Sequence, residues 1–201
     1  MIRSFTRVIA LAVGLCLGAC TGGRDSSRAV VVTDSSTERL YVPPCGDRII
    51  RYDGVGNLKL GMHADSVKAH CHVGFDEVWP GPEGMSQRVM MVSYSPDGVL
   101  AEIVNDSVWR LNVTSPGFQT ADSIRVGTPV ADLARRDDVQ GMIGEGVLAV
   151  VFRGRCGLSF LLTGGIPRGR TRNWNRKELA ALPATIRVKK ILVFKCPPSS
   201  L

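Results

Sequence analysis

The sequence predicts an α+β domain in which a helix plus an antiparallel strand meander occurs twice, giving one sheet with short helices on one face. Two observations predict this class. The first is a strand, a glycine and a helical turn in "LKLGMHADSVKAH" at 58–70, which recurs in "IRVGTPVADLARR" at 124–136. The second is that each copy is followed by strand-like segments with turns between them: "RVMMVSYS", "PDGVLAEIV" and "SVWRLNVTS" after the first copy, and "GVLAVVFRG" and "CGLSFLLTG" after the second. We therefore expect two repeats, at about 54–115 and 121–163.

Each repeat resolves into elements. In the first copy we expect a helix over 63–71, and in the second copy Thr128-Pro129 is typical of a helix N-cap and first helical position. Strands are predicted after the first copy at 88–94, 99–104 and 108–114, with turns at "SPDG" and at Asn105-Asp106-Ser107. The alternation places Trp109 in the core. The rest of the chain predicts strands in "GVLAVVFRG" and "CGLSFLLTG", a helix at 176–182 and a last strand that ends at Cys196.

The first twenty residues predict an export signal that ends in a lipidation site. Two arginines precede an apolar stretch at 8–19, which is shorter than the roughly 20 residues of a membrane-spanning helix and typical of the centre of a signal peptide. The stretch runs into "LGAC" at 17–20, which resembles the lipobox of bacterial lipoproteins. The resemblance implies that the signal peptide 1–19 is removed and that Cys20 carries acyl chains such as palmitate. Two or more acyl chains form a stable membrane anchor.

The residues after Cys20 indicate in which membrane the protein is anchored and how the domain is joined to the anchor. Residue 21 is threonine; an aspartate there would, by the bacterial sorting rule, suggest the inner membrane, so we expect the outer membrane, facing the periplasm. Residues 20–40 are rich in Gly, Ser, Thr and charge, and predict a flexible tether. The remainder, 41–201, is predicted to form a single domain with a basic C-terminal portion.

The repeat and the lipobox together resemble known envelope proteins. Leu60, Gly61, Met62 and Val67 match a short signature of the small lipoprotein of the outer-membrane β-barrel assembly machinery. The tandem helix-then-strands units look like the β-lactamase-inhibitor protein fold. This chain departs from the assembly lipoprotein in having two units and four further cysteines. The resemblance implies binding of a protein rather than catalysis.

The four cysteines after Cys20 predict two disulfide bonds, because an exported chain with an even number of cysteines is usually oxidised. Three pairings are open from the sequence. Cys45 and Cys196 flank the repeats, whereas Cys71 and Cys156 lie inside them. We therefore predict the nested pairing, Cys45 with Cys196 and Cys71 with Cys156.

Positive charge is concentrated at the C-terminal end. The chain has a formal net charge of +7, and residues 165–201 contain nine Lys or Arg against Glu178 alone. Arg168, Arg170 and Arg172 alternate with glycine or threonine, which predicts an exposed loop because unpaired guanidinium groups are costly to bury. With Trp174 as a contact anchor, they are a candidate binding site for anionic lipid or cell wall. A solvated loop without a partner is the alternative, and nucleic acid is not expected for an exported protein.

The sequence contains no recognised catalytic motif. A "GxSxG" nucleophile elbow is absent, and the glycines lack dinucleotide-binding spacing. His63, His70 and Asp65 support an alternative, an exported hydrolase or metal-dependent enzyme, but a metal site needs three or four converging ligands. We expect no metal and no cofactor. The sequence thus predicts a membrane-anchored, non-enzymatic binding module for an envelope protein or an anionic envelope component.

Overall fold

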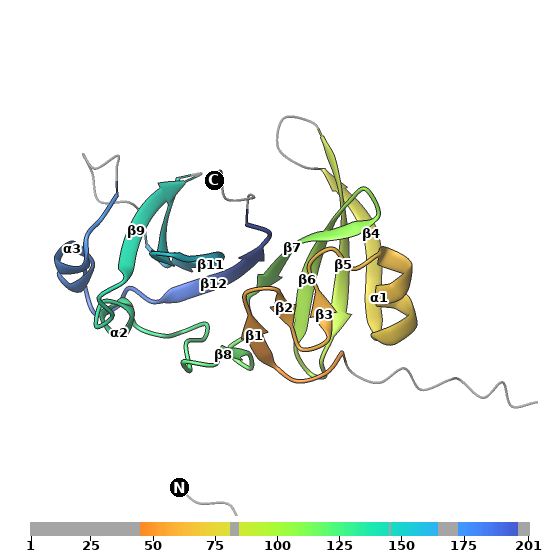
Figure 1. The fold of residues 1–201 in the computed structure, drawn as a ribbon, viewed down its shortest axis with the longest axis horizontal. Helices are drawn as coiled ribbons and strands as arrows, with labels where there is room; N and C mark the ends of the chain where they lie inside the picture. Colours follow the sequence, from red (N-terminus) through yellow and green to blue (C-terminus); the bar gives the residue numbers. More distant parts are fainter. Residues whose placement is uncertain (1–44, 81–84, 145, 165–172, 197–201) are drawn as a thin grey trace, which may run out of the picture. The chain divides into compact units, whose positions relative to one another are not determined.

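The computed structural model describes residues 45–80, 85–144, 146–164 and 173–196 (Figure 1). All of them belong to one compact unit, Leu40–Leu201. The signal peptide, Cys20, the tether and the arginines at 168, 170 and 172 lie outside the described residues.

The main element is an antiparallel sheet of eight strands in the order β4-β5-β6-β7-β12-β11-β10-β9. The first four strands follow each other along the chain, and β12 joins them to the later strands through the pairs Ile191–Val113 and Val193–Leu111. The bounds are β4 Val73–Pro80, β5 Ser86–Ser93, β6 Gly98–Val104, β7 Ser107–Val113, β9 Val139–Gly144, β10 Val147–Phe152, β11 Arg155–Leu162 and β12 Val188–Phe194.

Local sequence explains the tight connection between β6 and β7. Asn105 and Asp106 form the turn with φ of 49° and 54°, and a two-residue hairpin loop favours residues that tolerate positive φ at both positions. The expected turn at 105–107 and the strands expected near 88–94, 99–104 and 108–114 are confirmed within two residues at each end.

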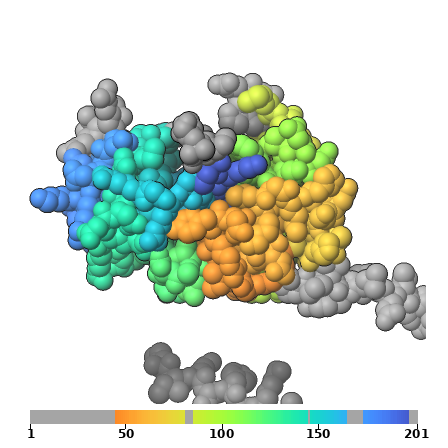
Figure 2. All heavy atoms as spheres, viewed as in Figure 1, coloured from red at the N-terminus to blue at the C-terminus, as the bar shows by residue number. Residues whose placement is uncertain are grey.

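A small second sheet covers part of the large one. Its order is β3-β2-β1-β8, with β3 Leu58–Lys59, β2 Gly54–Val55, β1 Ile49–Arg51 and β8 Gln119–Thr120. Figure 2 shows these early residues, in orange, against the cyan residues of the second half. At the contact, Gly157 has a φ of +105°, and a Cβ there would lie 2.8 Å from the Tyr52 carbonyl oxygen. A glycine is therefore required for this close approach.

Three short helices accompany the sheets: α1 Ala64–His70, α2 Val130–Leu133 and α3 Arg176–Ala180, with 7, 4 and 5 residues. In Figure 1, α1 lies beside the first half of the large sheet, and α2 and α3 lie beside the second half. Asn175 and Glu178 form a capping box at the start of α3. Within the described part of the chain, no helix is long and apolar enough to cross a membrane.

The predicted α+β class is wrong, because the domain is mostly β. The expected helix of the second repeat has only four residues, after which the chain turns into β9, a strand that the prediction missed. The strands of the two sheets contain about half of the described residues, whereas the three helices contain only 16. The domain is therefore a β structure with short helical turns, and not a repeated helix-plus-strand unit.

One hydrophobic core holds the domain together. Its buried residues come from both halves of the large sheet, from the small sheet and from all three helices, and include Met90, Leu111, Phe160, Val67 and Leu179. The compact unit Leu40–Leu201 therefore has its own core, which is what an independently folding domain requires.

An ion-pair cluster fastens α1 to the first half of the sheet. Asp76 of β4 accepts hydrogen bonds from Nε and Nη2 of Arg88 at 2.9 and 2.8 Å, and Nζ of Lys68 on α1 lies 2.6 Å from the same carboxylate. The hydrogen bonds from Arg88, followed by those from Lys68, hold the pKa of Asp76 well below its usual range. The carboxylate therefore stays charged and links the helix to two strands.

Candidate functional site

The two faces of the large sheet differ in what covers them. Alternate residues point to opposite faces of a strand, and Val99, Ala101 and Ile103 of β6 belong to the core shared with the helices and the small sheet. Their neighbours on the opposite face lie outside that core. We call this second face the open face; the register aligns Phe75, Met91, Leu100, Asn112, Leu192 and Ser159 across six of its strands.

A buried polar cluster lies at the centre of the open face. Glu102 is only 6% exposed and sits opposite Arg110 in the next strand. Its carboxylate accepts hydrogen bonds from Arg110 Nε at 2.9 Å, Asn112 Nδ2 at 2.7 Å and Gln87 Nε2 at 2.5 Å. Arg110 keeps about a third of its side chain exposed. The cluster thus holds a partly exposed guanidinium group in position on the open face.

Two adjoining hollows flank this cluster and share Trp109 and Arg110. One has a volume of about 400 Å³ and is lined further by Met142, Val151 and Phe194. The other, of about 290 Å³, is lined by Met85, Gln87, Glu102 and Val104 among others. We call the two together the sheet groove.

Trp109 is the exposed anchor of the sheet groove, and its predicted place in the core is wrong. Half of its surface is exposed. The reason is a β-bulge: Ile103 pairs with Val108 and Glu102 with Arg110, so that Trp109 is the extra residue. A bulge breaks the alternation on which the prediction depended and turns the indole toward the open face.

Both edges of the large sheet carry features that hinder pairing with another strand. The β4 edge is irregular between Val73 and Phe75 and ends at Pro80, which has no N–H group. The β9 edge is occupied, because Gly141 and Trp174 exchange backbone hydrogen bonds of 2.8 and 2.7 Å. The open face is therefore the better candidate for a contact surface.

Trp174 does not have the role predicted for it. It is 5% exposed, and a Cβ added at Gly141 would lie 2.8 Å from its Cβ, so the residue packs against β9. The arginines with which it was grouped, at 168, 170 and 172, are not among the described residues. Trp174 is a core residue and not a surface anchor.

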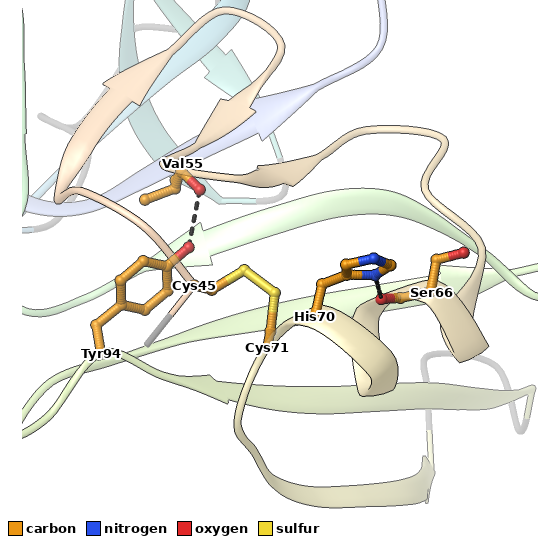
Figure 3. The surroundings of a disulfide bond; sticks show 6 residues. All are labelled: Cys45, Val55, Ser66, His70, Cys71 and Tyr94. Carbon is orange, nitrogen blue, oxygen red and sulfur yellow. Dashed lines mark hydrogen bonds between the residues drawn. A yellow bond between two sulfur atoms is a disulfide. The ribbon is translucent and has the colours of Figure 1, made fainter. Parts of the chain in front are cut away.

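His63, His70 and Asp65 do not converge on one point. His63 Nδ1 accepts a hydrogen bond from the Asp65 amide at 3.3 Å and so caps α1. His70 Nδ1 lies 2.8 Å from the Ser66 carbonyl oxygen, one turn earlier in the same helix (Figure 3). Across the described ranges there is no group of three or more His, Cys, Asp or Glu placed to hold a metal ion. Both imidazole rings therefore make hydrogen bonds within α1 or at its N-terminal cap.

The domain has two disulfide bonds, but the nested pairing is wrong. Cys45 is bonded to Cys71, and Cys156 to Cys196. Figure 3 shows Cys71, at the end of α1, turned toward Cys45, where both residues are buried in the core. The Cys156–Cys196 bond is explained by the strand pairing. β11 and β12 are antiparallel neighbours with Leu158 opposite Val193, so residues 156 and 196 lie at the same end of this strand pair.

Sequence reasoning missed Glu102, Arg110 and Asn112. The available signal was "AEIVNDSVWRLNV", in which polar residues recur at outward positions of two strands joined by a tight turn. Opposite charges on directly opposed positions of paired strands stabilise each other. Counting pairs outward from the turn, without the bulge, places Glu102 opposite Trp109 and not opposite Arg110, so this ion pair was not predicted.

Comparisons with known proteins give a solved structure with a partly similar fold. No family model matches the chain, and no curated protein matches it. Among solved structures, the uncharacterized protein yfeY from Escherichia coli superposes with a TM-score of 0.48 at 13% identity, over 75% of this chain and 99% of that one.

Proposed function

We propose that this chain is a membrane-anchored envelope protein that acts by binding another protein through the sheet groove. The observation that carries the proposal is the Trp109–Arg110 pair, exposed beside the buried Glu102 between two apolar hollows. Tryptophan and arginine in partly apolar pockets dominate the binding energy of many interfaces.

An enzymatic function has less support. The alternative enzyme would use His63, His70 and Asp65, but His63 and His70 bond within α1 or to its cap, and the three do not line the sheet groove. A catalytic constellation needs titratable side chains that converge on one reacting atom.

Replacing Trp109 with alanine is expected to weaken binding at the sheet groove about tenfold or more, because an exposed anchor tryptophan is removed. The measurement is photo-crosslinking in intact cells from a photoreactive residue placed at position 142, which lines the sheet groove. A crosslinked protein should be found with the parent chain and be strongly reduced by Trp109→Ala.

The matched control is Val78→Ala. Val78 is 64% exposed and lies in β4 opposite Arg88, whose side chain is on the helix side of the sheet. This variant should crosslink as the parent does, and both variants should unfold at nearly the parent temperature because both side chains are at least half exposed. Equal crosslinking by the Trp109→Ala chain would contradict the proposal.

The anchor is proposed from the "LGAC" sequence at 17–20. Replacing Cys20 with serine removes the thiol that would be acylated, so the protein should leave the membrane fraction or stay unprocessed. Fractionation of cells, with mass analysis of the N-terminal peptide, measures this. A Cys20→Ser protein that is cleaved before residue 20 and still membrane-bound would show that the lipobox interpretation is mistaken.

A further inference from the structure

A second cavity, of about 500 Å³, lies between the segment that contains α2 and the start of β12. Its polar lining includes Asp122, Ser123, Arg125, Thr128, Arg136 and Arg187. It shares no residue with the sheet groove. Its chemistry also differs, because arginines, aspartates and hydroxyl groups replace the apolar side chains of the groove.

The carboxylates in the wall of this cavity already face cations. Asp122 lies 2.5 Å from Arg136, which also contacts Asp138 at 3.2 Å and stacks 4.3 Å from the centre of the Phe152 ring. Asp132 lies 3.2 Å from Arg135. These contacts neutralise both wall aspartates and hold Arg136 in place.

Arg125 and Arg187 are left without a carboxylate partner among the described residues. One guanidinium nitrogen of Arg187 donates to the Gly127 carbonyl oxygen at 3.0 Å, which orients the group and leaves its other N–H donors available. The side chain of Arg125 is exposed, and no described residue accepts a hydrogen bond from it. Arg125 and Arg187 therefore place two positive charges in the cavity that no ion pair among the described residues balances.

The backbone brings these two arginines to the same turn. Arg125 N–H donates to the Thr128 hydroxyl at 3.0 Å, and the Gly127 amide donates to the Val188 carbonyl oxygen at 2.8 Å. Gly127 has a φ of +93°, which permits the turn. Ser123 also has positive φ, at 61°, an uncommon conformation for serine that is found more often at functional sites.

We propose that this cavity binds a phosphomonoester dianion, held by the guanidinium groups of Arg125 and Arg187 and by the hydroxyls of Ser123 and Thr128. Arginine forks match phosphate oxygens in geometry. The two unbalanced positive charges match the charge of a phosphomonoester near neutral pH. The group belongs either to a soluble phosphate compound or to a lipid headgroup such as phosphatidic acid.

The test is calorimetric titration of the unit Leu40–Leu201 with inorganic phosphate and, separately, with dihexanoyl phosphatidic acid below its micelle concentration. Saturable binding of at least one of them is expected, and Arg125→Gln should weaken it by about ten- to a hundredfold, as loss of a charged hydrogen-bond donor does. Arg153→Gln is the matched control, because Arg153 is also exposed and lies outside the cavity.

The two ligands distinguish the two possible sources of the phosphate group, a soluble compound and a lipid headgroup. Binding of phosphate alone points to a soluble phosphate compound, and tighter binding of the lipid points to a headgroup; both support the site. Absence of saturable binding of either ligand, or equal loss in Arg125→Gln and Arg153→Gln, would overturn it. Because Trp109 is not part of this cavity, Trp109→Ala should bind phosphate as the parent does, so the two proposals can fail separately.

Discussion

Replacing Cys45 and Cys71 together with alanine is expected to lower the free energy of unfolding by about 3–4 kcal/mol. The bond closes a separation of 26 residues, and its removal returns that conformational freedom to the unfolded chain. Both sulfur-bearing residues are at most 1% exposed, so their loss also loosens the core. Urea unfolding of the unit Leu40–Leu201, with parent and variant compared under oxidising conditions, measures the change.

Two controls make this result specific. Reduction should destabilise the parent more than the double variant, because the variant has only the Cys156–Cys196 bond to lose. Peptide mapping without reductant should recover Cys45 linked to Cys71. A peptide in which Cys45 is linked to Cys196 would contradict the structure, and a loss of stability below about 1 kcal/mol would contradict the predicted size of the effect.

The disulfide pairing could not be predicted from the positions of the cysteines along the chain. The nested pairing assumes that the outer two cysteines of the sequence bond to each other and that the inner two do so as well. In a sheet, however, strand pairing decides which residues lie close together. Cys156 precedes Leu158 in β11, and Cys196 follows Val193 in β12. Two neighbouring strands that each carry a cysteine at one end would have been the better guide, had the pairing of β11 with β12 been known.

The longer strands could be predicted because each is a short segment rich in Val, Leu, Ile, Met or Phe that is bounded by turn residues. The turn at Asn105-Asp106 has residues that suit a two-residue hairpin loop. In the small sheet, β3 coincides with the strand expected at the start of the first repeat. Strands of two residues such as β2 and β8 are too short to show any period, and their formation depends on tertiary contacts, so the small sheet as a whole was missed.

The predicted fold class was wrong because the length of the helix in the second repeat also depends on tertiary contacts. The "GTPVADLARR" segment has helix-start residues, and it does form one helical turn at α2. Helices gain stability by packing an amphipathic face over several turns, and here the chain leaves the helix after Leu133 to form β9. The helices expected at 63–71 and 176–182 do form as α1 and α3, but no signal after Thr128-Pro129 showed that the chain would leave the helix after one turn to form β9.

Both candidate sites depend on long-range geometry that composition does not reveal. The sheet groove needs the bulge at Trp109 to expose the indole. The cavity of Arg125 and Arg187 unites residues 62 positions apart, because Val188 pairs with Gly127 and Thr128 through backbone hydrogen bonds. The charge pattern of the sequence instead indicated the arginine-rich segment 168–172, because its density of charge is visible without the fold.

Replacing Phe118 with alanine is expected to lower the free energy of unfolding by about 3–5 kcal/mol, the range for removing a buried phenylalanine side chain. Phe118 is fully buried. Its ring meets Tyr94 edge-on with the ring centres 5.0 Å apart, and the Arg48 guanidinium carbon lies 5.9 Å from its centre. Urea unfolding measures the change, with Phe118→Leu expected to lose about 1.5 kcal/mol or less and exposed Gln119→Ala within about 0.5 kcal/mol of the parent.

The position of Phe118 also predicts how the domain unfolds. It precedes β8, which pairs with β1, and it belongs to the core cluster that contains residues of both halves of the large sheet. A cavity there should weaken both halves together, so amide hydrogen exchange in Phe118→Ala should accelerate to a similar extent in β6 and in β11. Faster exchange confined to β6, with β11 as slow as in the parent, would mean that the two halves have separate cores.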